Sequence, residues 1–318
     1  MITKLLGQFV VATLVMQMLP SDVSFFEWQT GVGSENYILA SEMIFPTAKE
    51  RPETLYPVKK VIDSYGIVTT AESALVIDRD SGMMLLGKRP DDLRSIGSVT
   101  KLMTAIVFLD QNPDLTEMVE LDPALDLIEG GRIYLAFYDP IMLEDVFGAS
   151  IVGSDNTATE SLMRFSGLSS EEFVEKMNQK AAELGMASTS FIDPTGINSY
   201  NMSTARDLVK LLEASEAYPV LQKYMTTQRL AVHHESGRVI EIENTNGVLE
   251  TFLNDGEYQV TAGKTGYLPQ AGYVLATAVK RAENEIYVVV LGSESIAARE
   301  DEVKGLAAWV FKVFQWPS

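Results

Sequence analysis

The sequence lacks cysteine altogether and contains only two histidines, and both shortages limit its chemistry. Without cysteine the chain cannot form a disulfide framework, a thiolate zinc site, a thiol nucleophile or a lipid-modified N-terminal cysteine. The two histidines, His233 and His234, are adjacent, so histidine-rich metal sites are excluded and histidine catalysis would have to use this pair. We expect the pair to face solvent or a strand edge. A Ser-His-Asp arrangement that uses it stays open as an alternative, although nothing marks a partner serine.

Basic residues are scarce relative to acidic ones. The 318 residues include 25 Lys and Arg against 44 Asp and Glu, which gives a formal net charge of −19. Phosphate backbones repel such a chain, so we expect no nucleic-acid partner. Hydrophobic residues make up 46% and charged residues 22%, which is ordinary for a folded globular protein and excludes wholesale disorder.

Long apolar runs are missing except near the N-terminus. One positive charge in residues 1–4 precedes a largely apolar stretch over residues 5–19, and Pro20 ends it. The stretch has about the length of a signal-peptide core and is short for a membrane span. Residues 1–22 are therefore predicted to be a signal peptide or an N-terminal membrane anchor, with a buried helix as the alternative. This prediction implies export to the periplasm or to the outer face of the cytoplasmic membrane.

The remaining chain divides into a lead-in and one regular domain. Residues 23–65 contain several glycines and prolines and little periodicity, so we expect a linker or irregular lead-in before a domain over residues 66–318. Strands are predicted at residues 73–78, 83–86, 229–232, 239–242, 258–263, 273–280 and 285–291. Helices are predicted from residue 98, at 142–152, at 157–165, from 169 to 185, from 204 and at 302–314. This order predicts an α+β plan within the broad α/β class, an antiparallel sheet with an inserted helical lobe. The aromatic terminal helix is expected to pack on the sheet rather than enter a membrane surface.

Three short strings carry residue types that suit acyl transfer. Ser98-Val99-Thr100-Lys101 begins a helix, Ser154-Asp155-Asn156 lies in a break between helices, and Lys264-Thr265-Gly266 lies in the strand-rich C-terminal part. Each has an ordinary structural interpretation when taken alone: the first serine can cap its helix, the second string can form a cap and turn, and the third can end a strand. Their occurrence in this order favours a shared site.

The residue types fit serine chemistry with a lysine base. A serine hydroxyl becomes a good nucleophile when a base takes its proton, and Lys101 lies about one helical turn from Ser98. A lysine acts as a base only if burial or a neighbouring positive charge lowers its pKa, and Lys264 can supply that charge. Ser154 can relay a proton to a leaving amine, and Asn156 can hold the lysine or a substrate amide.

Further residues of the strings suit substrate binding. Lys264 and Thr265 on an edge strand can bind a substrate carboxylate while the strand backbone pairs with the substrate. Gly266 has no side chain, so a substrate can come close there. The helix start at Ser98 offers free N–H groups beside a developing oxyanion.

The strings and their surroundings resemble the low-molecular-mass penicillin-binding proteins, the serine D-Ala-D-Ala carboxypeptidases of the peptidase S11 type. The resemblance covers about residues 72–314, with matching strings at 73–82, 98–105, 182–186, 191–196, 203–208, 244–246, 263–267 and 271–273. It implies a β-lactamase/transpeptidase-like fold, with an antiparallel sheet flanked by helices and a mainly helical lobe. It also implies removal of the terminal D-alanine from peptidoglycan stem peptides through an acyl-enzyme, with β-lactams as covalent inhibitors.

Carried over by position, the resemblance assigns roles to individual residues. The catalytic residues correspond to Ser98, Lys101 and Ser154. The substrate-binding residues correspond to Asn156, Lys264, Thr265 and Gly266. The oxyanion hole corresponds to the backbone N–H groups of Ser98 and Tyr267. The resemblance implies neither a metal nor an organic cofactor.

The sequence leaves related activities open. A DD-endopeptidase that cuts peptidoglycan crosslinks would use the same residues. Asp155 stands where this carboxypeptidase family usually has glycine, which brings the middle string nearer to class A β-lactamases. Those enzymes need a Glu-x-x-Leu-Asn string for deacylation, and residues 191–198 hold a carboxypeptidase-like string instead. A non-catalytic protein that binds cell-wall peptide is the remaining alternative.

Overall fold

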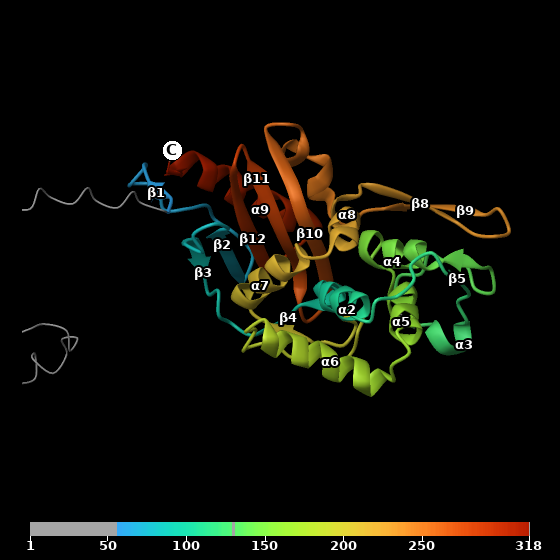
Figure 1. Cartoon of the computed structure of the whole chain (residues 1–318). Coiled ribbons are helices and arrows are strands. Elements are labelled where there is room, and N and C mark those ends of the chain that lie inside the picture. Colours follow the sequence, from blue (N-terminus) through green and yellow to red (C-terminus); the bar gives the residue numbers. More distant parts are fainter. Residues whose placement is uncertain (1–55, 129–130, 318) are drawn as a thin grey trace, which may run out of the picture. The chain divides into compact units, whose positions relative to one another are not determined.

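A five-stranded antiparallel sheet lies at the centre of the fold, with the strand order β10-β11-β12-β2-β3 (Figure 1). The computed structural model describes residues 56–128 and 131–317, so the prediction for residues 1–22 and most of the predicted lead-in lie outside the described residues. The strands of the sheet are β2 (Ser73–Asp78), β3 (Met84–Lys88), β10 (Tyr258–Leu268), β11 (Gly272–Arg281) and β12 (Asn284–Ser293). β2 and β3 pair as the predicted hairpin, whereas β10 continues to Leu268, beyond its predicted end.

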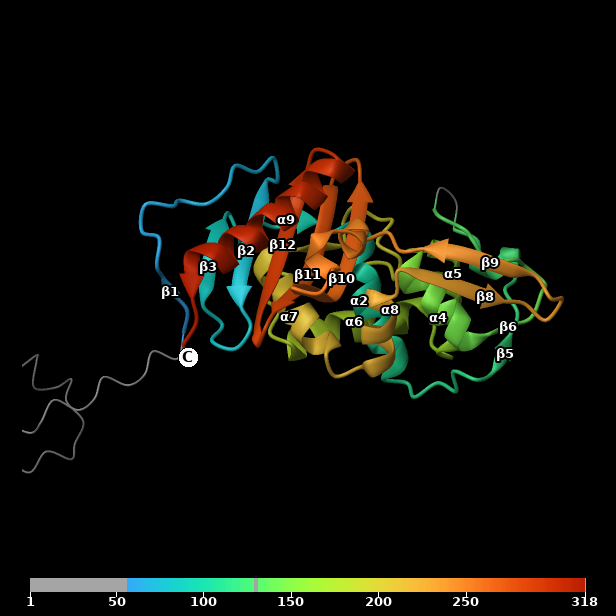
Figure 2. The same ribbon diagram turned by 90° about the horizontal axis from the view of Figure 1, so that it is seen from above.

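Both faces of this sheet are buried. Neighbouring residues of one strand point to opposite sides, so each strand contributes side chains to two cores. On β2, Val76 belongs to the core under the C-terminal helix α9 (Ile296–Val313), and Leu75 belongs to the core shared with the helical lobe. α9 lies along one face of the sheet, and α7 (Ala205–Ser215) packs on the other (Figure 2). The sheet is therefore a middle layer between helices, as the predicted α+β plan requires.

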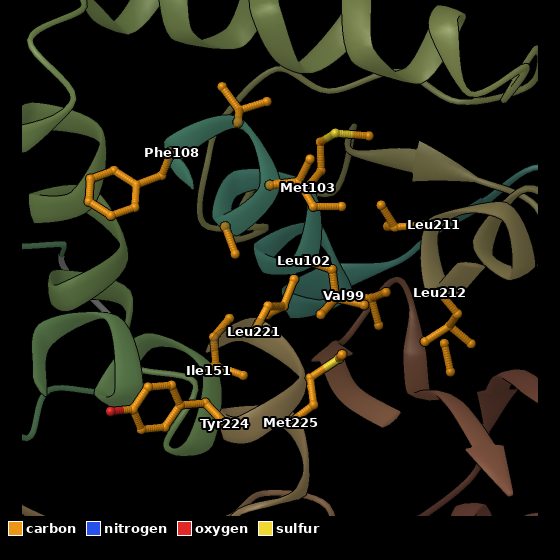
Figure 3. Close-up of a cluster of buried hydrophobic side chains, with 14 of the residues drawn as sticks. Val99, Leu102, Met103, Phe108, Ile151, Leu211, Leu212, Leu221, Tyr224 and Met225 are labelled. Carbon is orange, nitrogen blue, oxygen red and sulfur yellow. The ribbon is translucent and has the colours of Figure 1, made fainter. Parts of the chain in front are cut away.

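The helical lobe is built around α2 (Thr100–Leu109), which is buried along almost its whole length. The other helices of the lobe are α3 (Pro123–Asp126), α4 (Leu143–Val152), α5 (Asn156–Phe165), α6 (Ser170–Glu183) and α8 (Pro219–Thr226). Figure 3 shows side chains of α2 meeting those of α4, α7 and α8 in one apolar cluster. This packing fixes the start of α2, where the first string lies.

Helix caps bear out several of the predicted boundaries. Ser169 accepts a hydrogen bond from the N–H of Glu172, whose carboxylate accepts one from the N–H of Ser169, so the predicted capping box is confirmed. Thr204 caps α7 by accepting from the N–H of Asp207. The sequence did not predict α8, which begins with Pro219 at its first position, where a missing N–H costs no helical hydrogen bond.

Short paired strands and turns connect these elements. The pairs are β1 (Val58–Lys59) with β13 (Phe314–Gln315), β4 (Arg94–Ser95) with β7 (Met202–Ser203), β5 (Met118–Val119) with β6 (Ile141–Met142), and β8 (Arg229–His233) with β9 (Val239–Glu243). The 3-10 turns are η1 (Gly97–Val99), η2 (Gly247–Glu250) and η3 (Phe252–Asn254). The β8–β9 hairpin packs on α4.

The end of the lead-in packs against the C-terminal helix. β1 pairs with β13, and the indole N–H of Trp309 donates to the hydroxyl oxygen of Ser64 at 2.7 Å. Phe311 and Phe314 are buried in the core between α9 and the sheet, so the expectation that this helix packs on the sheet is confirmed. Within residues 56–128 and 131–317, no helix combines the length and the apolar character needed to cross a bilayer.

Candidate active site

Ser98 lies in the 3-10 turn η1, which leads directly into α2. Gly97 has a φ of +51° at this turn, a conformation that glycine adopts without steric penalty. Neither η1 nor α2 has a side-chain capping bond at its N-terminus, so the interpretation of Ser98 as a helix cap is wrong. The residue instead lines a cavity.

Lys101 lies in the first turn of α2 and is completely buried. Its Nζ lies 3.1 Å from Ser98 Oγ, 2.5 Å from Asn156 Oδ1 and 2.5 Å from the carbonyl oxygen of Thr195. The amide and carbonyl oxygens can only accept hydrogen bonds, so they take two N–H groups of the amine. On a neutral amine the remaining lone pair is then available to the hydroxyl of Ser98, the geometry that a general base needs.

The surroundings of Lys101 favour this neutral form. Burial lowers its pKa from the ordinary 10.5 to about 7, and the guanidinium of Arg132 acts in the same direction. The carboxylates of Asp193 and Asp155 oppose this effect. Near neutral pH a large share of the molecules therefore carry Lys101 as a free amine.

The second string joins α4 to α5. Ser154 has a φ of +58°, in the left-handed region that is uncommon for a residue with a side chain and often marks a constrained site. Asp155 is the N-cap of α5, and its carboxylate accepts from the N–H groups of Ala158 at 2.8 Å and Tyr134 at 2.6 Å. Ser154 and Asn156 line the cavity, whereas Asp155 is buried beside it as an anchor for the helix and for the segment before β6.

The third string lies within β10, on the outer edge of the sheet. Lys264 is buried, and its Nζ donates to the carbonyl oxygen of Thr265 at 3.2 Å. Burial lowers the pKa of Lys264 well below 10.5, and the positive charge of Lys101 adds to this effect. Thr265 lines the cavity and donates from its hydroxyl to that of Thr245 at 2.6 Å. An amine and a hydroxyl thus lie together beside Ser98.

Gly266 is where β10 meets the turn that carries Ser98. A Cβ at this position would overlap the carbonyl oxygen of Ile96 and would lie 3.2 Å from the backbone nitrogen of Ser98. A Cβ on Gly97 would likewise lie 3.0 Å from the backbone nitrogen of Tyr267. The sequence suggested that the absent side chain admits a substrate. The structure adds that it admits the protein's own backbone, which brings two backbone N–H groups to the cavity.

These residues surround a cavity of about 340 Å³. Its lining combines all three strings with residues to which the sequence assigned no role in the site: Gly131, Arg132, Gly196, Ile197, Thr245, Leu268, Tyr273, Ile296 and Arg299. No carboxylate is among the described residues that line it, and no cluster of possible metal ligands occurs in the part of the chain that the structure describes. The site is therefore polar, cationic and suited to an anionic ligand.

Arg299 is the most consequential residue that sequence reasoning missed. It lies in the first turn of α9 and is buried, with one N–H group directed to the carbonyl oxygen of Thr245 at 3.5 Å and another 3.3 Å from Glu300. Its Nε has no hydrogen-bond partner. Because the final helix was predicted to begin only at residue 302, nothing in the sequence pattern placed this arginine beside the strings.

The histidine pair lies away from the cavity lining. His233 is exposed at the end of β8, as expected. The expectation is wrong for His234, which is buried, with its ring Nδ1 3.0 Å from the carbonyl oxygen of Asp139. Packing of the β8–β9 hairpin against neighbouring segments, which the sequence pattern did not reveal, explains this burial.

Comparison with known proteins places the chain in a family. The model of the S11 peptidases, described as D-alanyl-D-alanine carboxypeptidase, matches residues 62–295. The chain is 33% identical to a D-alanyl-D-alanine endopeptidase of Pseudomonas aeruginosa, over 69% of this chain and 70% of that protein. It is 35% identical to a protein of the same name from Haemophilus influenzae, over 74% of this chain and 80% of the relative.

Other similar proteins bear different names. A D-alanyl-D-alanine carboxypeptidase of Bacillus subtilis is 26% identical over 77% of this chain and 63% of its own length. The structure of the Streptomyces K15 DD-transpeptidase superposes with a TM-score of 0.72 at 27% identity, covering 78% of this chain and all of that one. The predicted β-lactamase/transpeptidase-like fold is thereby confirmed. With most of its length matched, the chain belongs to the S11 family of D-alanyl-D-alanine carboxypeptidases, a family of serine DD-peptidases.

Proposed function

We propose that this S11 peptidase removes the terminal D-alanine from peptidoglycan stem peptides through an acyl-enzyme on Ser98. The observation that carries the proposal is the 3.1 Å separation between Ser98 Oγ and the Nζ of the buried Lys101, whose pKa is about 7. A hydroxyl beside a buried free amine, next to a cationic cavity, suits attack on a peptide carbonyl close to a free carboxylate.

Acylation begins when Lys101 accepts the proton of Ser98 and the serine oxygen attacks the carbonyl carbon before the terminal D-alanine. The backbone N–H groups of Ser98 and Tyr267 stabilise the negative charge that develops on the carbonyl oxygen. When the peptide bond breaks, protonated Lys101 returns its proton, relayed through the hydroxyl of Ser154, to the leaving amine, which departs as D-alanine and leaves Lys101 as a free amine. Water then attacks the ester with Lys101 again as base, releasing the shortened peptide and restoring Ser98.

The substrate is held by its charged end and by its backbone. Thr265 and Arg299 line the cavity and Lys264 is buried beside them, which supports binding of the terminal carboxylate by these side chains. The outer edge of β10 presents backbone groups that can pair with an extended peptide. Asn156 holds Lys101 through its oxygen, which leaves its amide N–H groups available for a substrate carbonyl.

A second candidate, cleavage of peptidoglycan crosslinks, is favoured by the names of the relatives. The proteins from Pseudomonas aeruginosa and Haemophilus influenzae, both above 30% identity, are named endopeptidases. The chemistry at Ser98 is the same for both activities. They differ in the group that bears the carboxylate beside the scissile bond, which is D-alanine in one case and a neighbouring stem peptide in the other.

Rapid β-lactam hydrolysis does not fit the site. That reaction needs a carboxylate that activates water against the acyl-enzyme, and none is among the described residues that line the cavity. Asp193 lies near but is occupied: its carboxylate accepts from the N–H groups of Thr195 and Gly196 at 2.7 Å. We therefore expect β-lactams to act as covalent inhibitors that form a long-lived adduct.

The cellular setting is part of the same proposal. Peptidoglycan lies outside the cytoplasmic membrane, so we expect residues 1–22 to direct export and, if retained, to attach the protein to the membrane. The net charge of −19 supports the expectation that nucleic acid is not a partner.

Labelling with a fluorescent penicillin tests the acyl-enzyme. We expect the native chain to be labelled, Ser98→Ala to remain unlabelled, and Ser188→Ala, which alters an exposed serine elsewhere, to be labelled like the native chain. Absence of native labelling would favour the non-catalytic cell-wall peptide-binding protein and contradict the proposal. Rapid loss of label by hydrolysis would instead indicate a β-lactamase.

Product analysis separates the two peptidase activities. Native protein is incubated with a stem pentapeptide and, separately, with a cross-linked dimer, and free D-alanine and monomers are quantified. Release of D-alanine supports the carboxypeptidase. Cleavage of the dimer without D-alanine release would contradict the carboxypeptidase and support the endopeptidase. Ser98→Ala should be inactive on both substrates.

A further inference from the structure

The cavity is cationic although the chain as a whole is acidic. Its positive charge comes from Arg132 and Arg299, which line it, whereas Lys101 and Lys264 are buried beside it as amines whose pKa burial lowers. The described lining contains no carboxylate, whereas the whole chain carries a net charge of −19. Positive charge concentrated in one cleft of an acidic protein favours a substrate with more than one negative group.

The two arginines reach the cavity from different parts of the fold. Arg299 comes from α9, which packs on the sheet, and it lies with Lys264 on the sheet side. Arg132 comes from the segment between α3 and β6, and its carbonyl oxygen accepts a hydrogen bond from the backbone N–H of Asn156 at 2.9 Å. It therefore approaches the cavity from the helical side, beside the start of α5.

The backbone around Arg132 is held firmly while its side chain is exposed. On one side, Gly131 lies so close to Asn156 that a Cβ would overlap the amide of that residue. On the other side, the buried carboxylate of Asp155 accepts from the N–H of Tyr134 at 2.6 Å. A fixed backbone with a solvent-accessible guanidinium can contact a group outside the cavity without moving the catalytic string.

A single terminal carboxylate does not need both arginines as binding partners. Lys264, Thr265 and the buried Arg299 already surround the carboxylate beside the scissile bond, and D-alanine has no other. A leaving group that is itself a stem peptide carries further carboxylates on its acidic residues. Arg132 also lowers the pKa of Lys101, Lys264 and Arg299, which agrees with its lying close to all three.

We infer that Arg132 binds a second carboxylate, on the leaving stem peptide of a cross-linked substrate, and so favours crosslinks over terminal D-alanine. The inference rests on the proposed serine DD-peptidase activity and names its specificity-determining residue. The guanidinium forms an ion pair with the leaving stem peptide at the rim of the cavity. It does not touch the atoms between which bonds form and break. It therefore affects KM for crosslinks more than KM for small substrates, because its influence on the pKa of Lys101 is shared by all substrates.

The test compares native protein, Arg132→Gln, Arg132→Lys and Arg229→Gln, the last being an exposed arginine on the β8–β9 hairpin that serves as control. Each is assayed with a cross-linked dimer, with the same dimer whose additional leaving-peptide carboxylates are converted to carboxamides, and with a pentapeptide. We expect Arg132→Gln to raise KM for the unmodified dimer about fivefold, with Arg132→Lys intermediate. Arg132→Gln should lose equally little on the carboxamide dimer and on the pentapeptide, since both report only its shared influence on Lys101, and it should lose clearly more on the unmodified dimer.

Each other outcome overturns a specific claim. Equal losses on dimer and pentapeptide would mean that Arg132 acts on the shared chemistry, and an unchanged KM for the dimer would mean that it contacts no carboxylate there. A native protein that releases D-alanine but does not cleave the dimer would also overturn the inference, while the proposed function stands. A native protein that penicillin does not label overturns the proposed function, and the inference with it.

Discussion

Replacing Lys101 by methionine should abolish acylation and remove a pH dependence of stability that this buried amine causes. The pKa of Lys101 is about 7 in the folded protein and 10.5 in an exposed chain. Between these values the unfolded chain binds one more proton than the folded chain, so the free energy of unfolding increases with pH. Below pH 7 both states are protonated, and the folded state carries the full cost of a buried ammonium group.

The magnitude follows from the two pKa values. A separation of ~3.5 pH units corresponds to about 5 kcal/mol. Integrating the linkage relation from about pH 6 to about pH 9 assigns about 3 kcal/mol of this to a practical pH range. Lys101→Met also leaves the oxygens of Asn156 and Thr195 without their partner, at a cost that does not depend on the protonation of the lysine. That loss cancels when changes with pH are compared.

The assay is urea unfolding of the native chain, Lys101→Met and Lys312→Met at about pH 6 and about pH 9. Lys312 is an exposed lysine in the last turn of α9 and provides the matched control. The native chain and Lys312→Met should gain about 3 kcal/mol more than Lys101→Met over this interval. Equal gains in all three proteins would show that Lys101 keeps its proton in the fold, and penicillin labelling of Lys101→Met would show that another group is the base.

Three further predictions concern the site and the fold. The rate at which a penicillin acylates the native chain should rise with pH and level off above about pH 7, because only unprotonated Lys101 accepts a proton; a flat profile from about pH 5 to about pH 8 contradicts this. Gly266→Ala should lose labelling because its Cβ meets the carbonyl oxygen of Ile96, whereas Gly87→Ala meets only the end of a methionine side chain and should keep it; equal labelling would refute the backbone contact. Ser169→Ala should lower the free energy of unfolding by about 1 kcal/mol with labelling intact, as urea unfolding can measure; unchanged stability would mean that the capping box contributes nothing.

The sequence predicted those elements whose formation depends mainly on residues that are neighbours in the chain. The strand β2, which is buried along its whole length, and the capping box at Ser169 correspond to what the sequence indicated. The end of β10 was missed because Lys264 and Thr265 are polar, and a polar run normally indicates the end of a strand. Their burial depends on contacts with the helical lobe, which the local pattern does not encode.

The site shows the same division. Ser98 and Lys101 could be predicted as a pair because residues three apart in a helical turn lie on the same side. The structure places their two side chains together. Arg132 and Arg299 reach the site from segments with no motif signal of their own, and the matching string at residues 191–196 did not reveal that the carbonyl oxygen of Thr195 meets Lys101. Only the tertiary fold brings them to the lysine and the serine, so sequence reasoning had no means of finding them.

The outer edge of β10 limits the length of peptide that can pair with the protein backbone. The stretch of this strand that lines the cavity spans only residues 265–268, and η1, η3 and α8 contact β10. So short an edge offers few backbone hydrogen bonds, too few to hold an uncharged chain along its length. On the proposed function we therefore expect the protein to select chain termini and branch points, where carboxylates occur, and to bind a continuous neutral peptide weakly.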